Sequence, residues 1–339
     1  MLRRYRATGA DLPFGNPRAA HPGVAMEGYF WRFTDAPNGR VVVGLCGVSR
    51  ADDGRWANIS LAEHPSGFHR EGYAPEAGAS AERLDVHAGA MFHGEEDRVR
   101  VALADDARLD VRLTRLRGFP RALGYGGAGF AHALPGLSQY WHPHVLGGRA
   151  TGTATIGDET VELNGAQVYA EKNWGRGGFP DHWWWGQAQG FDERPDEVCV
   201  AFAGGPVHVG PLKLFATALV VRLGDETIRL GDPIRTPVKH ELDDHRWQLR
   251  GRGARYSVEV DGRAPLEDAH VLPVPLPKER RMVPGALEHL GGTLELTVRK
   301  RGSGVVYRGT SHLAGLEHGS LARAQAEAER RAATSPATR

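Results

Sequence analysis

The chain has 339 residues, of which 41% are hydrophobic and 24% charged, and its formal net charge is +1. This length allows one large or two ordinary domains, and the composition is that of a globular rather than a disordered protein. A charge so close to zero argues against a nucleic-acid-binding surface, which needs clustered basic residues. The two cysteines, Cys46 and Cys199, are far apart in the sequence, so neither a disulfide framework nor a cysteine zinc site is expected.

Alternating apolar and polar residues are the strongest regular pattern, and they predict β-strands. These alternating runs lie within residues 39–50, 55–64, 97–103, 108–116, 149–174, 216–232, 246–251, 255–262 and 293–301. The segment "ADDA" (104–107) fits a hairpin loop, and the similar stretches "IGDETVEL" (156–163) and "LGDETIRL" (223–230) each contain a Gly-Asp turn. Short strands with 45 glycines and 21 prolines favour antiparallel sandwiches or barrels.

Helices are scarce. The best prediction is residues 319–333, an Ala/Glu/Arg-rich surface helix with Ser320 as a possible cap. Between about 117 and 140 the alternation gives way to a glycine-rich segment, which is the natural place for a domain connection. Its "GYGGAG" lacks the strand and helix that a nucleotide-binding loop requires. We therefore predict β domains over residues 1–137 and 138–316, followed by a helical tail over 317–339.

The segment "AEKNWGRGGFPDHWWWGQAQGF" (170–191) holds four of the eight tryptophans of the chain. On extended strands alternate residues share a face. One strand would then present Gln167, Tyr169, Glu171 and Asn173 together, with Val168, Ala170, Lys172 and Trp174 behind, and the next would present Trp183, Trp185, Gln187, Gln189 and Phe191. Rings interleaved with amides are typical of a ligand-cavity wall, which is the interpretation we favour. The alternative is plain core, which we prefer for Trp184.

Other side chains could carry chemistry. His142 and His144 are two apart and could share a strand face, but Pro143 intervenes and no third ligand is placed to complete a metal site, so none is expected. Glu27 precedes three aromatic residues and Glu317 follows an apolar run. Each could be a solvated surface group, or a buried acid whose pKa is raised by desolvation.

Four segments together resemble the tocopherol cyclase family: "EGYFWRF" (27–33), "YWHPHVL" (140–146), "AEKNWGRGGFPDHWWWGQ" (170–187) and "YRGTSHLAGLEHG" (307–319). The third is the most diagnostic, because it is long and rich in rare residues. The family is related to two-domain lipocalin-like proteins that include carotenoid hydratases. The resemblance implies two consecutive antiparallel β-barrel domains of the calycin type. It also implies closure of a prenylated hydroquinone to a chromanol without a cofactor.

Such a reaction assigns provisional roles. Glu171, or else Glu27, would donate the proton, with His142 in reserve, although Glu171 could instead be ionised and purely structural beside Lys172. The residues expected to line the substrate site are Tyr169, Asn173, Trp174, Trp183, Trp185, Gln187 and Gln189. Of these, Trp183 and Trp185 would face the cation. Asn173 and Gln187 would position the hydroquinone head. The alternatives are a non-catalytic carrier of an isoprenoid or pigment, and an isoprenoid hydratase.

The expected location is the cytoplasm. No run of about 18 apolar residues could span a bilayer, and the basic N-terminus lacks the apolar core of a secretion signal. An isoprenoid substrate would nevertheless have to come from a membrane, so transient contact with a membrane surface is expected. The sequence does not indicate an oligomeric state.

Overall fold

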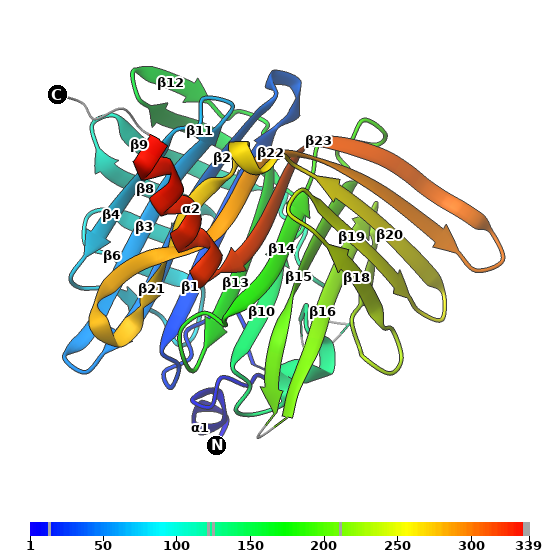
Figure 1. Ribbon diagram of the computed structural model, residues 1–339, viewed down its shortest axis with the longest axis horizontal. Coiled ribbons are helices and arrows are strands. Elements are labelled where there is room, and N and C mark those ends of the chain that lie inside the picture. The colour runs from blue at the N-terminus through cyan, green and yellow to red at the C-terminus, as the bar shows by residue number, and fades with distance from the viewer. Residues whose placement is uncertain (13–14, 121–122, 124–125, 210–211, 335–339) are drawn as a thin grey trace.

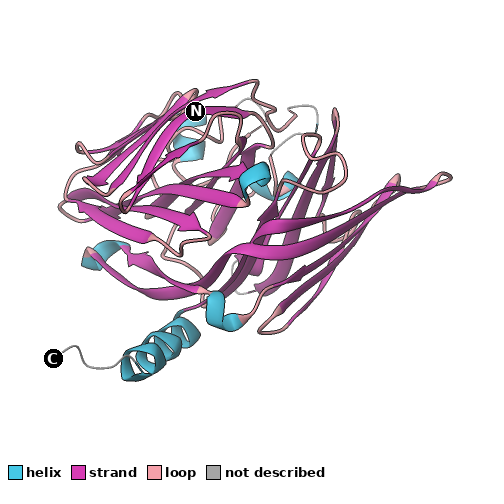
Figure 2. Cartoon of the chain, turned by 90° about the horizontal axis from the view of Figure 1, so that it is seen from above, coloured by secondary structure: helices cyan, strands magenta, loops and turns pink. Residues whose placement is uncertain are grey.

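Two antiparallel sheets lie side by side in the computed structural model and form most of the molecule (Figures 1 and 2). The structure describes residues 1–12, 15–120, 123, 126–209 and 212–334. Within these residues the chain first builds a 13-stranded sheet from β1 to β13 and then a 10-stranded sheet from β14 to β23. Each sheet packs around an apolar core of its own. The predicted all-β class is confirmed.

Most strands follow one another with short connections, and the long exception lies between β9 and β10. The first sheet contains β1 (Met26–Asp35), β2 (Arg40–Ala51), β3 (Gly54–His64), β4 (His69–Ala74), β5 (Gly78–Ala79), β6 (Asp85–Ala88), β7 (Phe92–Glu95), β8 (Arg98–Ala104), β9 (Ala107–Thr114), β10 (Gln139–Val145), β11 (Arg149–Ile156), β12 (Glu159–Glu162) and β13 (Gln167–Gly175). The second contains β14 (His182–Ala188), β15 (Val198–Val209), β16 (Leu212–Leu223), β17 (Glu226–Leu230), β18 (Val238–Leu242), β19 (Arg246–Arg252), β20 (Tyr256–Arg263), β21 (His270–Leu276), β22 (Arg281–Lys300) and β23 (Gly304–Ser320).

The helices within the described residues are peripheral and short. They are α1 (Leu2–Arg6), α2 (Leu321–Thr334) and the 3-10 turns η1 (Ala36–Asn38), η3 (Gly129–Ala133), η4 (Leu266–Asp268) and η5 (Pro277–Glu279). The backbone N–H of Arg323 donates to the Ser320 hydroxyl at 3.4 Å, in keeping with the predicted cap of α2. Helix α2 packs on β21 and β22 and buries Ala324 there. None of these helices is long and apolar enough to cross a membrane.

The sequence pattern explains the strands well. In β9 every second residue is buried, which is the alternation that the sequence predicts for a strand with one covered face. Both Gly-Asp turns occur as expected. Gly157 joins β11 to β12 with φ +60°, and Gly224 joins β16 to β17 with φ +64°. Such left-handed positions are freely open only to glycine.

The boundary between the sheets differs from the predicted domain boundary at 137–138. Strands β10 to β13, residues 139–175, pair within the first sheet, and the chain crosses to the second sheet only between β13 and β14. The helical tail is predicted to begin at residue 317, but helix α2 begins at Leu321, because β23 extends to Ser320. The glycine-rich segment had suggested a linker, but it is a long connection that returns the chain to the sheet it left.

Strands β13 and β14 are buried on both faces over most of their length. Val168 and Ala170 on one face of β13 belong to the core of the first sheet, and Trp184 on β14 belongs to the core of the second. The opposite faces, which include Tyr169 and Trp185, meet each other in a separate apolar cluster between the sheets. The aromatic residues are therefore concentrated where two sheets share an interface.

A buried ion pair lies within the first sheet. The Lys172 ammonium is 3.0 Å from the Glu27 carboxylate and also donates to the Ala19 carbonyl at 2.7 Å. His21 joins this pair to Asp11 through a 2.7 Å contact between its Nε2 and the Asp11 carboxylate. Burial alone would raise the pKa of Glu27, but Lys172 and His21 outweigh burial and lower the pKa to about 2. Glu27 is therefore ionised at neutral pH.

Replacing Lys172 with Met should destabilise the fold by about 3–5 kcal/mol, because the Glu27 carboxylate would remain buried without its counter-ion. Urea denaturation followed by far-UV circular dichroism measures this loss. The double variant Lys172→Met/Glu27→Gln, which buries no unpaired charge, should recover much of the lost stability. A loss in the double variant that equals the sum of the losses in Lys172→Met and Glu27→Gln would show that the pair is not coupled.

Candidate functional site

The facing surfaces of the two sheets each contribute a row of side chains. In the first sheet Phe30 on β1 lies directly opposite Glu171 on β13. In the second, Glu317 on β23 lies between its direct partners Trp185 on β14 and Glu288 on β22. Directly opposed residues project from the same face, so each row is continuous. The ring of Trp185 joins the rows, since its centroid is 5.4 Å from that of Phe30 and its Nε1 donates to Glu171 at 2.8 Å.

The carboxyl group of Glu171 is held by three donors that all meet one oxygen. Oε2 accepts hydrogen bonds from Trp141 Nε1 at 2.9 Å, from Trp185 Nε1 at 2.8 Å and from the Tyr169 hydroxyl. The proton of a neutral Glu171 would therefore lie on the other oxygen, Oε1. Burial raises the pKa of Glu171 above its ordinary value, even though the three hydrogen bonds act in the opposite direction.

Two more carboxyl groups lie in the second row. Burial raises the pKa of Glu317 to about 7, despite a hydrogen bond from the Trp183 indole to its Oε1. Burial also raises the pKa of Glu288 well above its ordinary value, and the neighbouring charge of Glu317 adds to this. Glu288 is buried, whereas Glu317 and Trp183 remain partly exposed.

Arg32 crosses from the first sheet to the second. It lies on β1 opposite Tyr169, and its Nη2 donates to the carbonyl oxygens of Leu290 at 2.8 Å and Leu313 at 2.6 Å. Burial lowers the pKa of the guanidinium to about 10, so it remains cationic at neutral pH. Its Nε and Nη1 have no hydrogen-bond partner among the described residues.

Glu171, Glu288, Glu317 and Arg32 form what we call the carboxyl cluster. The Arg32 charge opposes the rise in the pKa of Glu288. Three carboxylates facing one guanidinium in a weakly solvated interface would repel one another strongly. The cluster therefore retains at least one proton at neutral pH.

Two glutamines extend this polar interface. Gln187 is fully buried, with its Nε2 3.7 Å from Cys199 Sγ. Gln189 is also fully buried and donates to the Val168 carbonyl of the first sheet at 3.1 Å. The Oε1 of each glutamine lacks a partner within the described chain. Buried polar atoms of this kind are normally completed by water or a ligand.

Three of the residues predicted for the site lie on the opposite face of the first sheet. Trp174 is stacked between His21 and Tyr140, with ring centroids 4.4 and 5.6 Å apart. Glu27 and His142 project on this same face, because they pair with Trp174 and Lys172 respectively. Strand alternation thus separates all three from Glu171, and we leave them out of the site.

The remaining predicted residue, Asn173, lies on the face of Glu171 but is already engaged. Its Oδ1 accepts the backbone N–H of Gly28 at 3.1 Å. Two cavities, of about 680 and 630 Å³, lie elsewhere in the fold, because the lining of neither includes Glu171, Trp183 or Trp185. The partly exposed Trp183 and Glu317 form the accessible edge of the carboxyl cluster.

Sequence reasoning missed Trp141, Arg32 and Glu288. Trp141 stands in the quoted segment 140–146, where the histidines drew attention instead. Arg32 is the one charged residue in the apolar run "GYFWRF" (28–33), and Glu288 interrupts the apolar "GALEHL" (285–290). A charged residue inside an apolar strand is the signal that could have identified both, since buried charges are rare unless they are paired.

Comparison with known proteins shows the family to which the chain is similar. The Tocopherol cyclase-like family model matches residues 54–320. Over 199 residues the chain is 29% identical to "Probable tocopherol cyclase, chloroplastic" of Oryza sativa subsp. japonica, which covers 57% of this chain and 42% of that protein. The chain thus spans less than half of that relative's length.

Solved structures share the fold. CghA superimposes with a TM-score of 0.56 at 12% identity, covering 88% of each chain. Kievitone hydratase from Nectria haematococca superimposes with a TM-score of 0.50 at 13% identity, covering 88% of this chain and 89% of the other. At such low identities the likeness concerns the architecture alone. With the family model matching most of its length, the chain belongs to the tocopherol cyclase-like family.

Proposed function

We propose that the protein is an isomerase that closes a prenylated hydroquinone or a related isoprenoid to a chromanol by acid catalysis, without a redox cofactor. The observation that carries this proposal is the buried Glu171 carboxyl group, oriented by two indoles and a phenol and surrounded by further acids. Family membership supports the substrate class.

The proposed reaction is an internal addition. The proton on Oε1 of Glu171 moves to the prenyl alkene, which becomes a tertiary carbocation while Glu171 becomes a carboxylate. The phenol oxygen attacks the cation and forms the new C–O bond, and the phenol proton returns to Glu171. Substrate and product have the same atoms. Because the three donors hold Oε2, the catalytic proton is presented from a fixed position.

The indoles and amides have separate proposed roles. Trp183 and Trp185 stabilise the carbocation through their ring faces, an attraction of about 0.5–2 kcal/mol per ring that grows as water is excluded. The unpartnered Oε1 of Gln187 accepts a hydroxyl of the head group, and Gln189 and Tyr169 fix the neighbouring walls. A neutral amide orients a phenol without adding a competing charge.

Two alternatives need the same interface. A carrier would bind an isoprenoid without changing it, and a hydratase would let water capture the carbocation. Product mass distinguishes them when the purified protein is incubated with prenylated hydroquinones and a carotenoid extract. Cyclisation leaves the mass unchanged, hydration adds one water, and a carrier yields no product.

Replacing Glu171 with Gln should reduce turnover by at least about 100-fold, because the amide cannot donate an acidic proton. Substrate binding and the thermal unfolding midpoint should change little, since an amide oxygen can still accept from the two indoles. Glu295→Gln, at an exposed position of β22, is the matched control and should keep full activity. Full activity of the Glu171→Gln enzyme would exclude Glu171 as the donor.

Replacing Tyr169 with Phe should shift the alkaline limb of the pH–rate profile to higher pH by up to about one unit. The Tyr169 hydroxyl stabilises ionised Glu171 and so lowers its pKa. Its removal raises that pKa, and the acid stays protonated to higher pH. Tyr307→Phe is the control, because that hydroxyl donates to the Glu193 carbonyl instead. A limb that does not move, or that moves to lower pH, would contradict the assignment.

An apolar substrate also needs delivery, and we propose transient membrane contact through the end of the β15–β16 hairpin. Leu214 and Phe215 are exposed there, at 51% and 56%, and Lys213 lies beside the Phe215 ring. His182, next to Trp183, packs on Phe215 with ring centroids 5.6 Å apart. The exposed apolar side chains therefore lie close to the accessible edge of the carboxyl cluster.

The double variant Leu214→Ser/Phe215→Ser should sediment several-fold less with phospholipid vesicles than the parent protein, because it loses apolar surface that would enter the interface. Turnover of vesicle-borne substrate should fall in parallel, while turnover of detergent-dispersed substrate should not. Ile234→Ser, which removes an exposed apolar side chain elsewhere, serves as the control. Equal sedimentation of all three proteins would refute contact at this hairpin.

A further inference from the structure

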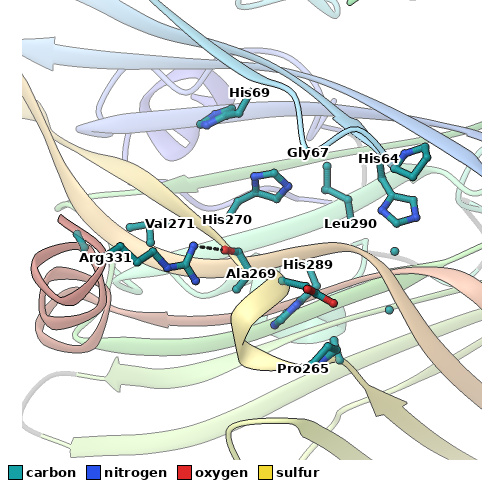
Figure 3. Close-up of a pocket in the computed structure, with 16 residues that line it drawn as sticks. His64, Gly67, His69, Pro265, Ala269, His270, Val271, His289, Leu290 and Arg331 are labelled. Atoms are coloured by element: carbon teal, nitrogen blue, oxygen red, sulfur yellow. Dashed lines mark hydrogen bonds between the residues drawn. The ribbon is translucent and has the colours of Figure 1, made fainter. Parts of the chain in front are cut away.

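A cavity of about 680 Å³ lies where both sheets meet helix α2. Its lining includes four histidines, each from a different part of the fold: His64 at the end of β3, His69 on β4, His270 on β21 and His289 on β22. Figure 3 shows these imidazoles around a common space, with Arg331 of α2 at one side. We call this cavity the histidine pocket. The proposed cyclisation uses none of these residues.

The histidine pocket contains buried polar atoms without partners. His289 is 3% exposed, and neither of its ring nitrogens has a hydrogen-bond partner among the described residues. The buried Nε2 of His69 makes no hydrogen bond among these residues either, although it lies 3.5 Å from the Glu71 carboxylate. Leaving such groups unpaired costs free energy, so they indicate a place where another molecule completes the hydrogen bonds.

The lining offers hydrogen bonds but little net charge. Burial lowers the pKa of His69 and of His289 to about 4, and it also lowers that of His64 and His270, so all four are neutral at pH 7. Arg331 is already engaged, since it donates to the Glu327 carboxylate and to the Ala269 carbonyl at 2.7 and 2.6 Å.

We propose that the histidine pocket is a binding site for a neutral ring that carries hydroxyl groups, such as a phenol or hydroquinone, separate from the carboxyl cluster. A neutral imidazole offers one donor and one acceptor, and a hydroxyl group offers the same pair in return. A carboxylate or phosphate would find no free cation among the described residues of the lining. Pro265, Val271 and Leu290 supply apolar surface for the ring.

Metal binding is the obvious alternative for four histidines, and the geometry does not favour it. The described residues contain no group of three or more His, Cys, Asp or Glu side chains placed to hold a metal ion. The rings of His69 and His270 meet edge to face, with their centroids 6.0 Å apart and an angle of 68° between their planes. The imidazoles line different walls of the cavity rather than converge on one point.

The histidine pocket and the carboxyl cluster share a wall. Leu290 lines the cavity, and its carbonyl oxygen accepts the hydrogen bond from Arg32 at 2.8 Å. His64 lies on the same side, where the Arg32 charge contributes to the lowering of its pKa. A ring bound in the histidine pocket would therefore rest on β22, the strand whose Leu290 carbonyl also accepts the hydrogen bond from Arg32.

Calorimetric titration of the full chain with trimethylhydroquinone tests the proposal. We expect saturable binding, at least about tenfold weaker binding of the dimethyl ether, which has no donor, and no comparable binding of benzoate. His289→Phe and His270→Phe should each weaken binding by about tenfold, the equivalent of one lost hydrogen bond to a buried group. The half-buried His270 gives a second variant should His289→Phe fold poorly.

The controls locate the ligand. His312→Phe, at an exposed position outside the cavity, should bind as the parent does. Trp185→Leu, which alters the carboxyl cluster, should also keep the affinity within about twofold. Binding that is lost in Trp185→Leu but kept in both histidine variants would place the ring in the carboxyl cluster and overturn the proposal. So would equally tight binding of benzoate, or no binding, which would indicate a water-filled cavity. None of these readouts depends on turnover.

Discussion

The contact between the outer faces of the two sheets is the constraint on which the rest of this structure depends. In an isolated sheet, residues such as Tyr169 and Trp185 would face water. Here they face each other, and the strands that carry them are covered on both sides. Burial on both faces explains why the segment 170–191 can be so rich in aromatic residues while it also keeps glutamines. The rings exclude water, and the glutamines make the hydrogen bonds that such an interface still needs.

Burying this interface has an electrostatic consequence. Solvent that would separate three carboxyl groups is removed, and Arg32 balances only one of them. Keeping a proton then costs less free energy than ionising all three groups. A neutral carboxylic acid avoids both the desolvation of a charge and repulsion from the other carboxylates. The protonated carboxyl group that the proposed chemistry needs is therefore favoured by packing rather than by any unusual residue. Arg32 also ties the two sheets together through backbone carbonyls, so charge balance and sheet contact are coupled.

Much of the fold could be predicted from the sequence, because strand alternation is a local property. The hairpin turns, strands β9 and β11, and the helix after Ser320 can all be predicted from patterns that are a few residues long. The sheet boundary could not, since it depends on which distant strands pair, and the glycine-rich segment before β10 returns the chain to the first sheet. Glu171, Tyr169, Trp185 and Gln187 could be grouped by parity alone. Arg32 and Glu288 are both more than 100 residues away from Glu171 in the sequence, so only the tertiary fold brings them close to it.

Parity also separates two glutamates that look equivalent in the sequence. Glu27 and Glu171 both lie on neighbouring strands of the first sheet, and both are buried. Glu27 projects to the face of Lys172, where a 3.0 Å ion pair keeps it ionised and structural. Glu171, adjacent to Lys172 in the chain, projects to the other face and meets only neutral donors there. Lys172, which follows Glu171 in the chain, is paired with Glu27 instead. Glu171 is thus left to neutral donors between the sheets, where burial raises its pKa. A single-residue shift in the register of β13 would turn Lys172 toward the carboxyl cluster and take it away from Glu27.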